Sequence, residues 1–135
     1  MRLLVCGGRN FGLFADERNF IRKHITEVLC PAGAAALWDR EQDLIISGAA
    51  VGTDTVAALF AMHMGVPLDQ YPVTEEEWAL YGRAAGPRRN RRMIVEGKPD
   101  AVLAFNGGPG TRNMIQQAKN NDIPVIERLY GSFKR

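Results

Sequence analysis

Three short apolar runs, each followed at once by a glycine-rich turn and then by a helical pattern, constrain the fold more than any other feature of this chain. The three runs, with the turns that follow them, lie at residues 3–12, 44–54 and 101–111. Short continuous apolar runs are typical of strands buried on both faces, and their alternation with helices predicts a parallel sheet. We therefore predict an α/β fold: a single Rossmann-like, doubly wound domain over residues 1–135, with a mainly parallel sheet of about five strands and helices on both faces.

The length and the charge balance limit the classes of protein that the chain can be. A chain of 135 residues, 46% hydrophobic and 24% charged, is typical of one globular domain. A net charge of +2 permits an anionic ligand without requiring nucleic acid. No apolar run is long enough for a membrane span or a signal peptide. Cys6 and Cys30 lack metal-ligand spacing, so we expect both thiols to be reduced and buried. We also expect no metal, no cofactor and a cytoplasmic protein.

The spacing of hydrophobic residues, together with the glycine, proline and capping residues between them, predicts the individual strands and helices. Strands are expected at residues 2–6, 44–47, 68–71, 101–105 and 124–127. Helices are expected at residues 16–29, 53–64, 87–96 and 111–121. Between the third strand and the third of these helices, Thr74 and Glu77 have the spacing of a capping box.

Some side chains within these elements have expected positions. Asp16 is expected to cap the first helix. Four residues of the second helix are expected to face the core: Val56, Leu59, Phe60 and Met64. Residues 34–43 fit either a helix extension or a surface loop, with Trp38 packed against the sheet.

The turn at residues 106–111 has the features of an anion site. Its glycines let the backbone turn sharply and approach a ligand closely, because no Cβ stands in the way. The free N–H groups of a helix that opens at Thr111, together with the helix dipole, favour negative charge. Since the strand-to-helix turns of such a sheet meet at its carboxyl edge, we expect all three glycine-rich turns to face one crevice.

Candidate ligand-binding residues follow from that placement. Arg89 is expected to reach the crevice with Asn90, because a guanidinium can donate two parallel charge-assisted hydrogen bonds to a phosphate. Asp54 is a candidate for holding a ribose hydroxyl, and a favourable charge at a helix start explains it as well. The whole set is Gly7, Gly8, Arg9, Asn10, Ser47, Gly48, Gly52, Thr53, Asp54, Arg89, Asn90, Gly107, Gly108, Gly110 and Thr111.

Several candidates have a simpler alternative role. The hydroxyl residues of the set can act as helix caps. Four arginines among residues 88–92 can form a solvated face or an inter-subunit set of salt bridges. Phe11 and Trp78 can stack on a base or pack in the core.

Four stretches of the chain carry a resemblance to a known family: Val5–Phe11, Ser47–Asp54, Ala85–Met93 and Ala104–Thr111. They resemble the motifs of the SLOG superfamily, and the chain is most similar to its small stand-alone YspA-like branch, whose function is unknown. The resemblance implies a Rossmann-like fold related to that of the Lonely Guy phosphoribohydrolases and of DNA processing protein A.

The resemblance departs from the Lonely Guy enzymes at the residues that serve catalysis. Those enzymes cleave the N-glycosidic bond of nucleoside monophosphates and carry the motif Pro-Gly-Gly-x-Gly-Thr-x-x-Glu. In this chain the proline is replaced by Asn106 and the glutamate by Met114. A methionine can neither hold a ribose nor stabilise an oxocarbenium ion, which argues against that activity.

We predict that the chain binds a phosphorylated nucleoside, a nucleotide or an ADP-ribose derivative, as a sensor, sequestering or accessory protein. The alternative is a nucleotide N-glycosidase that uses a relocated carboxylate, with Asp54 and Arg89 as catalytic candidates. A second alternative, single-stranded nucleic acid binding, rests on Arg83 and residues 88–92 beside aromatic side chains. The resemblance also implies a homodimer.

Overall fold

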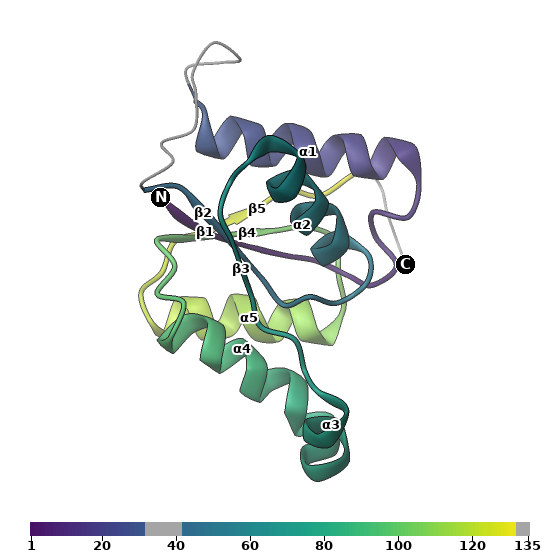
Figure 1. Cartoon of the computed structure of the whole chain (residues 1–135), viewed down its shortest axis with the longest axis vertical. Helices are drawn as coiled ribbons and strands as arrows, with labels where there is room; N and C mark the ends of the chain where they lie inside the picture. The colour runs from purple at the N-terminus through teal and green to yellow at the C-terminus, as the bar shows by residue number, and fades with distance from the viewer. Residues whose placement is uncertain (32–41, 132–135) are drawn as a thin grey trace.

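A five-stranded sheet forms the centre of the structure, a computed structural model that describes residues 1–31 and 42–131 (Figure 1). The strands are β1 (Arg2–Cys6), β2 (Leu44–Ser47), β3 (Leu68–Gln70), β4 (Ala101–Ala104) and β5 (Val125–Glu127). They lie in the order β3-β2-β1-β4-β5, and every neighbouring pair is parallel. The predicted α/β fold with a doubly wound parallel sheet is confirmed.

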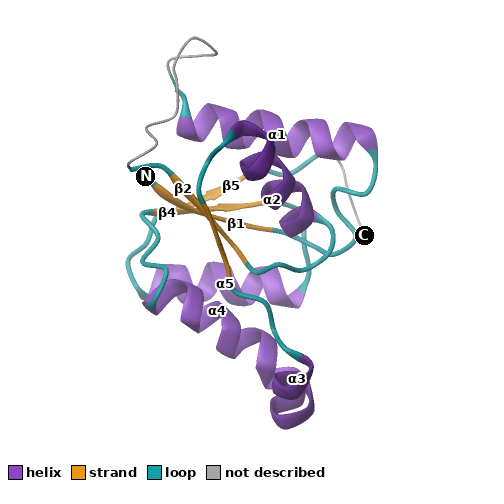
Figure 2. Ribbon diagram, viewed as in Figure 1, coloured by secondary structure: helices purple, strands orange, loops and turns teal. Residues whose placement is uncertain are grey.

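Helices cover both faces of this sheet (Figure 2). They are α1 (Ala15–Leu29), α2 (Thr53–Met64), α3 (Glu75–Tyr81), α4 (Ala85–Val95) and α5 (Pro109–Asn120), with a short 3-10 helix, η1 (Gly82–Ala84), between α3 and α4. The helices α1 and α2 pack on one face, and α4 and α5 pack on the other. Helix α3 projects beyond α4 and contributes no buried side chain.

The alternation of side chains along β1 divides the core into two layers. Leu3 and Val5 belong to the layer under α1 and α2, whereas Leu4 and Cys6 belong to the layer over α4 and α5. All four side chains are buried. Because successive side chains of a strand point to opposite faces, a strand that is covered on both sides must be apolar throughout.

The strand order brings the carboxyl ends of β1 and β4 together at the centre of the sheet. The chain leaves β1 towards β2 on one side and later fills the other side with β4, which creates a topological switch point. The turns after these strands are joined by hydrogen bonds from Phe105 N to Cys6 O (2.9 Å) and from Gly8 N to Asn106 O (2.7 Å). Two of the glycine-rich turns are therefore held against each other where open α/β sheets bind ligands.

The predicted cap of the first helix is wrong. Helix α1 begins one residue before Asp16, and no side chain caps it. Asp16 lies within the first turn, where its Oδ2 accepts a 2.8 Å hydrogen bond from the Tyr130 hydroxyl. The buried carboxylate of Glu17 accepts one from Gly12 N at 3.0 Å. A side chain from inside the helix therefore fixes the loop that precedes it.

Three further helix predictions need correction. Leu59 and Met64 are exposed rather than in the core. Leu59 directly precedes Phe60, so its side chain lies about 100° away around the helix and outside the stripe that faces the sheet. Helices α4 and α5 each begin two residues earlier than expected, at Ala85 and Pro109. Proline suits this position because the first N–H groups of a helix have no partner within it. The other boundaries agree to within one residue.

Two smaller predictions are confirmed, and one falls mostly outside the structure. Thr74 and Glu77 form the capping box, with backbone–side-chain hydrogen bonds of 3.1 and 3.2 Å. The two cysteines are buried and free. The predictions for residues 34–43 and Trp38 fall largely on residues 32–41, which the structure does not describe. Among residues 1–31 and 42–131, no helix has both the length and the apolar character needed to cross a membrane.

Candidate functional site

A cavity of about 970 Å³ lies at the carboxyl edge of the sheet, over the ends of β1 and β4. Its walls come from the turn after β1, the start of α2, the α3–η1 segment, the first turns of α4 and the β4–α5 turn. The volume is at the upper end of the range typical of small-molecule sites, about 300–1,000 Å³. All three glycine-rich turns contribute to it, so the structure brings them together around one space.

The β4–α5 turn forms one wall of this cavity. A Cβ on Gly107 would overlap the Thr111 side chain, whereas a Cβ on Gly108 or Gly110 would meet nothing within 4 Å. No side chain caps α5, and within the described residues the N–H groups of Gly110 and Thr111 make no hydrogen bond. The positive end of a helix therefore opens into a cavity at a place where the backbone is bare.

Arg89 enters the cavity from α4 in a fixed orientation. Its Nη1 donates to Gly48 O, and its Nε donates to Asn90 Oδ1 at 3.1 Å. Its Nη2 makes no hydrogen bond with any residue that the structure describes. Burial lowers the pKa of Arg89, and nearby Asp54 opposes this effect. The guanidinium remains charged, because its ordinary pKa lies above about 12, and one terminal nitrogen is available to a ligand.

Asn90 connects this arginine to the start of α5. Its Nδ2 donates to Gly110 O (3.2 Å) and to Asn113 Oδ1 (3.1 Å), while its Oδ1 accepts from Arg89. Asn113 is further held by Gln117, whose Nε2 donates to it at 2.8 Å. Since Asn90 is buried and fully hydrogen-bonded, its role in the cavity is to fix Arg89 relative to the helix terminus.

Asp54 contributes a carboxylate to the same cavity from the first turn of α2. The residue is only 6% exposed, and its Oδ2 accepts a hydrogen bond from Ala50 N at 3.2 Å. Its Oδ1 accepts none from the described residues. Burial raises the pKa of Asp54 to about 6; the Ala50 N–H and then Arg89 and Arg9 act in the opposite direction. Asp54 therefore titrates close to neutral pH.

Four predicted site residues do not line the cavity: Ser47, Gly48, Gly52 and Thr53. Thr53 is fully buried, and its Oγ1 donates to Gly8 O and Phe11 O at 3.3 Å each. Ser47 is fully buried as well, and its Oγ accepts from Ala49 N at 3.3 Å. These residues hold the turns in shape from behind, and their contribution to the site is indirect.

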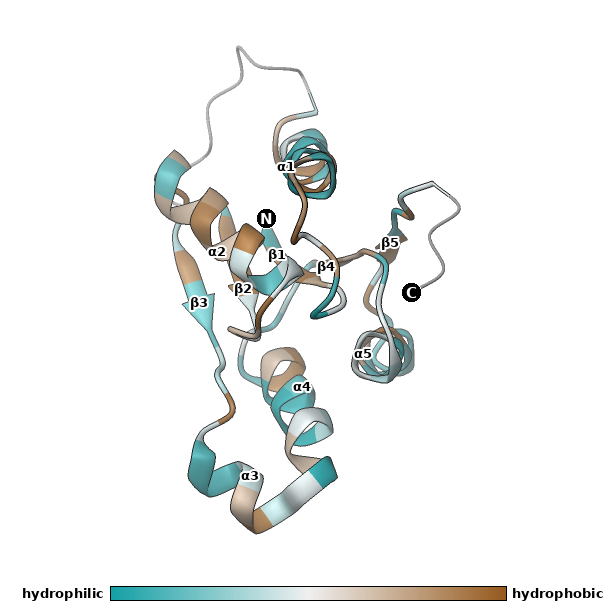
Figure 3. Ribbon diagram, turned by 90° about the vertical axis from the view of Figure 1, so that its right-hand side faces the viewer, coloured by the Kyte–Doolittle hydropathy of each residue, from teal (hydrophilic) through white to brown (hydrophobic). Residues whose placement is uncertain are grey.

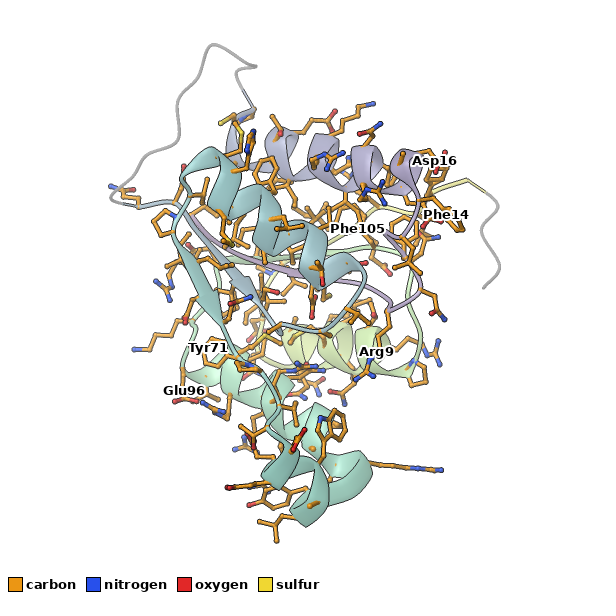
Figure 4. All side chains as sticks on the ribbon, turned by 45° about the vertical axis from the view of Figure 1, so that its right-hand side comes forward. Arg9, Phe14, Asp16, Tyr71, Glu96 and Phe105 are labelled. Carbon is orange, nitrogen blue, oxygen red and sulfur yellow. The ribbon has the colours of Figure 1, made fainter. Side chains whose placement is uncertain are left out.

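The aromatic candidates occupy different environments. Phe11 is buried in the core, where its ring stacks on Phe105 with centroids 6.2 Å apart. Trp78, on α3, is 41% exposed and lines the cavity. Arg9 lies over its ring at 5.9 Å, and Figure 4 shows Arg9 on the side of the sheet that carries α4 and α5. Trp78 is the aromatic side chain best placed to meet a planar ligand group.

The sequence did not identify some of the residues that line the cavity. It also left open where the arginines next to Arg89 lie. Cys6 and Asn113 line the cavity and were not among the candidates. The signal for Asn113 is its place at the start of the second turn of α5, three residues after Gly110 and therefore on the same side of the helix. Outside the cavity, Arg88 lies 3.8 Å above the Tyr81 ring, and Arg92 pairs with Glu96.

The described residues contain no group of three or more His, Cys, Asp or Glu side chains that could hold a metal ion. The fold and the site thus define an α/β protein with a Rossmann-like sheet and a cavity at its switch point. Comparisons with family models, with curated proteins and with solved structures find no match for this chain. The resemblance to the SLOG superfamily stays a prediction that rests on the four sequence stretches alone.

Proposed function

We propose that this cavity binds a phosphorylated nucleoside, either a nucleotide or an ADP-ribose derivative. The observation that carries the proposal is the bare start of α5, which opens into the cavity beside Arg89. Unpaired backbone N–H groups at a helix N-terminus and a free guanidinium nitrogen are the donors that phosphate oxygens prefer. Gly108 and Gly110 leave room for such an anion, because no protein atom fills the space beside them.

The rest of the cavity suits the rest of such a ligand. Among the residues that the structure describes, three arginines and one carboxylate are the charged groups that line it: Arg9, Arg83, Arg89 and Asp54. This balance favours a ligand with more than one negative charge. Trp78 and Arg9 offer a face for a base, and the Oδ1 of Asp54, which has no partner among the described residues, can form a hydrogen bond with a ribose hydroxyl. The protein would act as a sensor, sequestering or accessory protein for that ligand.

The test is a thermal-shift screen against nucleoside mono-, di- and triphosphates, NAD and ADP-ribose. A ligand at a hundred times its dissociation constant adds about 2.7 kcal/mol to the free energy of unfolding, a shift of several degrees for a chain of this size. We expect the shift to vanish in Arg89→Ala and to persist in Arg91→Ala. Arg91 is exposed on the same helix and does not line the cavity, which makes it a matched control.

Gly110→Ala provides a second variant, in case the loss of Arg89 hydrogen bonds destabilises the fold. A methyl group there meets no protein atom, so the fold is expected to survive while the anion is excluded. If no compound shifts the wild-type protein, the proposal is wrong, and single-stranded nucleic acid becomes the next ligand to test. A shift that Arg89→Ala and Gly110→Ala both retain would place the ligand elsewhere.

Cleavage of the bound ligand is a second candidate function, favoured by the protonation of Asp54. A carboxyl group whose pKa burial raises to about 6 has the proton affinity that suits a general acid. In an N-glycosidase, the bond between the base and C1′ of the ribose would break, Asp54 would protonate the departing base, and water would add to C1′. Release of free base, followed by chromatography, tests this reaction. Asp54→Asn should abolish the release and retain part of the binding, and absence of any release from the wild-type protein rejects the enzyme.

We also propose a homodimer, supported by the outward side of α2. This helix is apolar along most of its length (Figure 3), and its Leu59 and Met62 side chains are exposed. Exposed apolar groups that cluster on one helix are typical of contact surfaces. Sedimentation velocity tests the proposal: a dimer that Met62→Lys dissociates supports it, and a monomer at all concentrations rejects it.

A further inference from the structure

The cavity combines two features that conflict electrostatically. The start of α5 and three arginines favour an anion, yet the ionised carboxylate of Asp54 faces the same space. Asp54 is almost fully buried, and no Lys, Arg or His nitrogen of the described residues lies within 4.0 Å of its oxygens. Once a ligand fills the cavity, little water remains to screen the two like charges, so they repel strongly. A bound phosphate and an ionised Asp54 therefore destabilise each other.

Resting on the function proposed above, we propose that the cavity binds its phosphorylated ligand together with one proton, which is taken up by the Asp54 carboxyl group. The protonated carboxyl carries no charge and can donate a hydrogen bond from the oxygen that now has no partner. Ligand binding and proton binding then assist each other, because each is weaker without the other.

The groups around Asp54 determine how far its protonation responds to a ligand. Helix α4 contributes Arg89, and the turn after β1 contributes Arg9; both favour the ionised form. Strand β1 contributes Cys6, whose thiol burial keeps neutral, and β2 contributes the Ser47 hydroxyl, which donates to Asp54 O at 3.5 Å. Since the Ser47 bond goes to the backbone carbonyl oxygen, the one hydrogen-bond partner of the carboxylate among the described residues is the Ala50 N–H.

A phosphorylated ligand acts on this balance in one direction. It pairs with the guanidinium groups of Arg9 and Arg89, whose charges otherwise favour ionised Asp54. It also displaces water from the cavity, which adds to the burial of the carboxyl group. Both changes raise the pKa of Asp54 further above its value of about 6 in the free protein. Near neutral pH, ionised Asp54 of the free protein therefore takes up a proton as the ligand binds.

The sign of the pH dependence follows. Below about pH 6 Asp54 is already protonated in the free protein, so affinity is highest and nearly constant. Between the free-protein and the complex pKa values, affinity falls by up to about tenfold for each unit by which the pH rises. The site would therefore release its ligand as the solution becomes more alkaline.

Isothermal titration calorimetry with ADP-ribose tests the coupling. Its diphosphate is esterified at both ends and does not titrate near neutral pH, unlike a phosphomonoester, whose second proton leaves at about pH 6. Binding is measured near neutral pH in two buffers with different heats of ionisation, so that the difference in heat counts the protons taken up. We expect an uptake approaching one proton for the wild-type protein and none for Asp54→Asn. Asp122→Asn, an exposed carboxylate outside the cavity, should match the wild type.

The possible outcomes separate this inference from the function on which it rests. Binding without proton uptake by the wild-type protein overturns the coupling and leaves the nucleotide site intact. An uptake that persists in Asp54→Asn overturns it as well. If ADP-ribose does not bind at millimolar concentration, the titration is repeated with the compound that the thermal-shift screen identifies, and no binding by any compound of the screen overturns both. If Asp54→Asn fails to bind, NMR titration of the Asp54 carboxyl carbon in the wild-type protein decides the question. A higher pKa with ligand supports the coupling, and an unchanged or lower pKa overturns it.

Discussion

The two kinds of glycine in this site differ in what surrounds them. Gly52, between β2 and α2, has φ +77°, and a Cβ there would lie 2.5 Å from both Gly8 O and Arg9 O. Gly110, at the start of α5, has an ordinary backbone, and a Cβ there would meet nothing within 4 Å. The first glycine is required by the fold, which presses one turn against another. The second is not, and it borders the cavity.

This difference shows how a glycine-rich turn should be interpreted. In sequence the two turns are alike, since each follows an apolar strand and opens a helix. In the structure, the turns after β1 and β2 fill each other's space, and the free space lies at the turn after β4. A glycine without a neighbour that also borders the cavity, such as Gly108 or Gly110, leaves room for a ligand. The following predictions test that distinction, from the largest expected effect to the smallest.

Gly52→Ala should have the largest effect on stability. The alanine must adopt a backbone conformation that only glycine reaches easily, and its methyl group must overlap two carbonyl oxygens. We expect a loss of about 3 kcal/mol or more in the free energy of unfolding, measured by urea denaturation. Gly65→Ala is the matched control, because Gly65 has φ +73° with no atom near its Cβ. Its expected cost is about 1–2 kcal/mol, and equal losses in the two variants would contradict the role of the contact.

Asp54→Asn should change how stability depends on pH. The pKa of Asp54 is about 6 in the folded protein, against about 3.9 for an unfolded aspartate. The folded state thus binds more protons in this window, so its stability falls as the pH rises from about 4 to about 6 and stays lower above. The asparagine variant, which has no such titration, should gain up to about 3 kcal/mol relative to the wild type at neutral pH. Urea denaturation at acid and neutral pH checks it, and an equal difference at both pH values would contradict it.

Gly110→Ala should affect stability least and ligand binding most specifically. Alanine in a helix favours folding by at most about 1 kcal/mol over glycine, and no clash opposes it here. Binding of ADP-ribose should weaken at least about tenfold, because the methyl group occupies the space beside the open N–H groups. Gln116→Ala is the control: Gln116 is exposed on the same helix and does not line the cavity. Equal binding by both variants would show that the bare start of α5 does not hold the ligand.

Much of the fold could be predicted from local sequence. The apolar runs of β1, β2 and β4, and the glycine-rich turns behind them, identify a parallel sheet, since only a strand covered on both faces is apolar throughout. Asp16 and Leu59 were misplaced for a related reason. Whether a carboxylate caps a helix depends on the residue at which the helix begins, and whether a leucine faces the sheet depends on how the helix is rotated against it; residue spacing specifies neither.

The sequence alone determined the class of fold and the edge of the sheet where the candidate residues gather. Both follow from periodicity and from the short connections of a parallel sheet, which are local properties of the chain. Only the tertiary structure decided which candidates line the cavity and which, like Gly52 and Thr53, brace it from behind. It also decided that Asp54 is buried and forms no ion pair within 4.0 Å among the described residues. The burial of a side chain and its hydrogen-bond partners depend on segments that are far apart in the sequence, so they are defined only once the chain has folded.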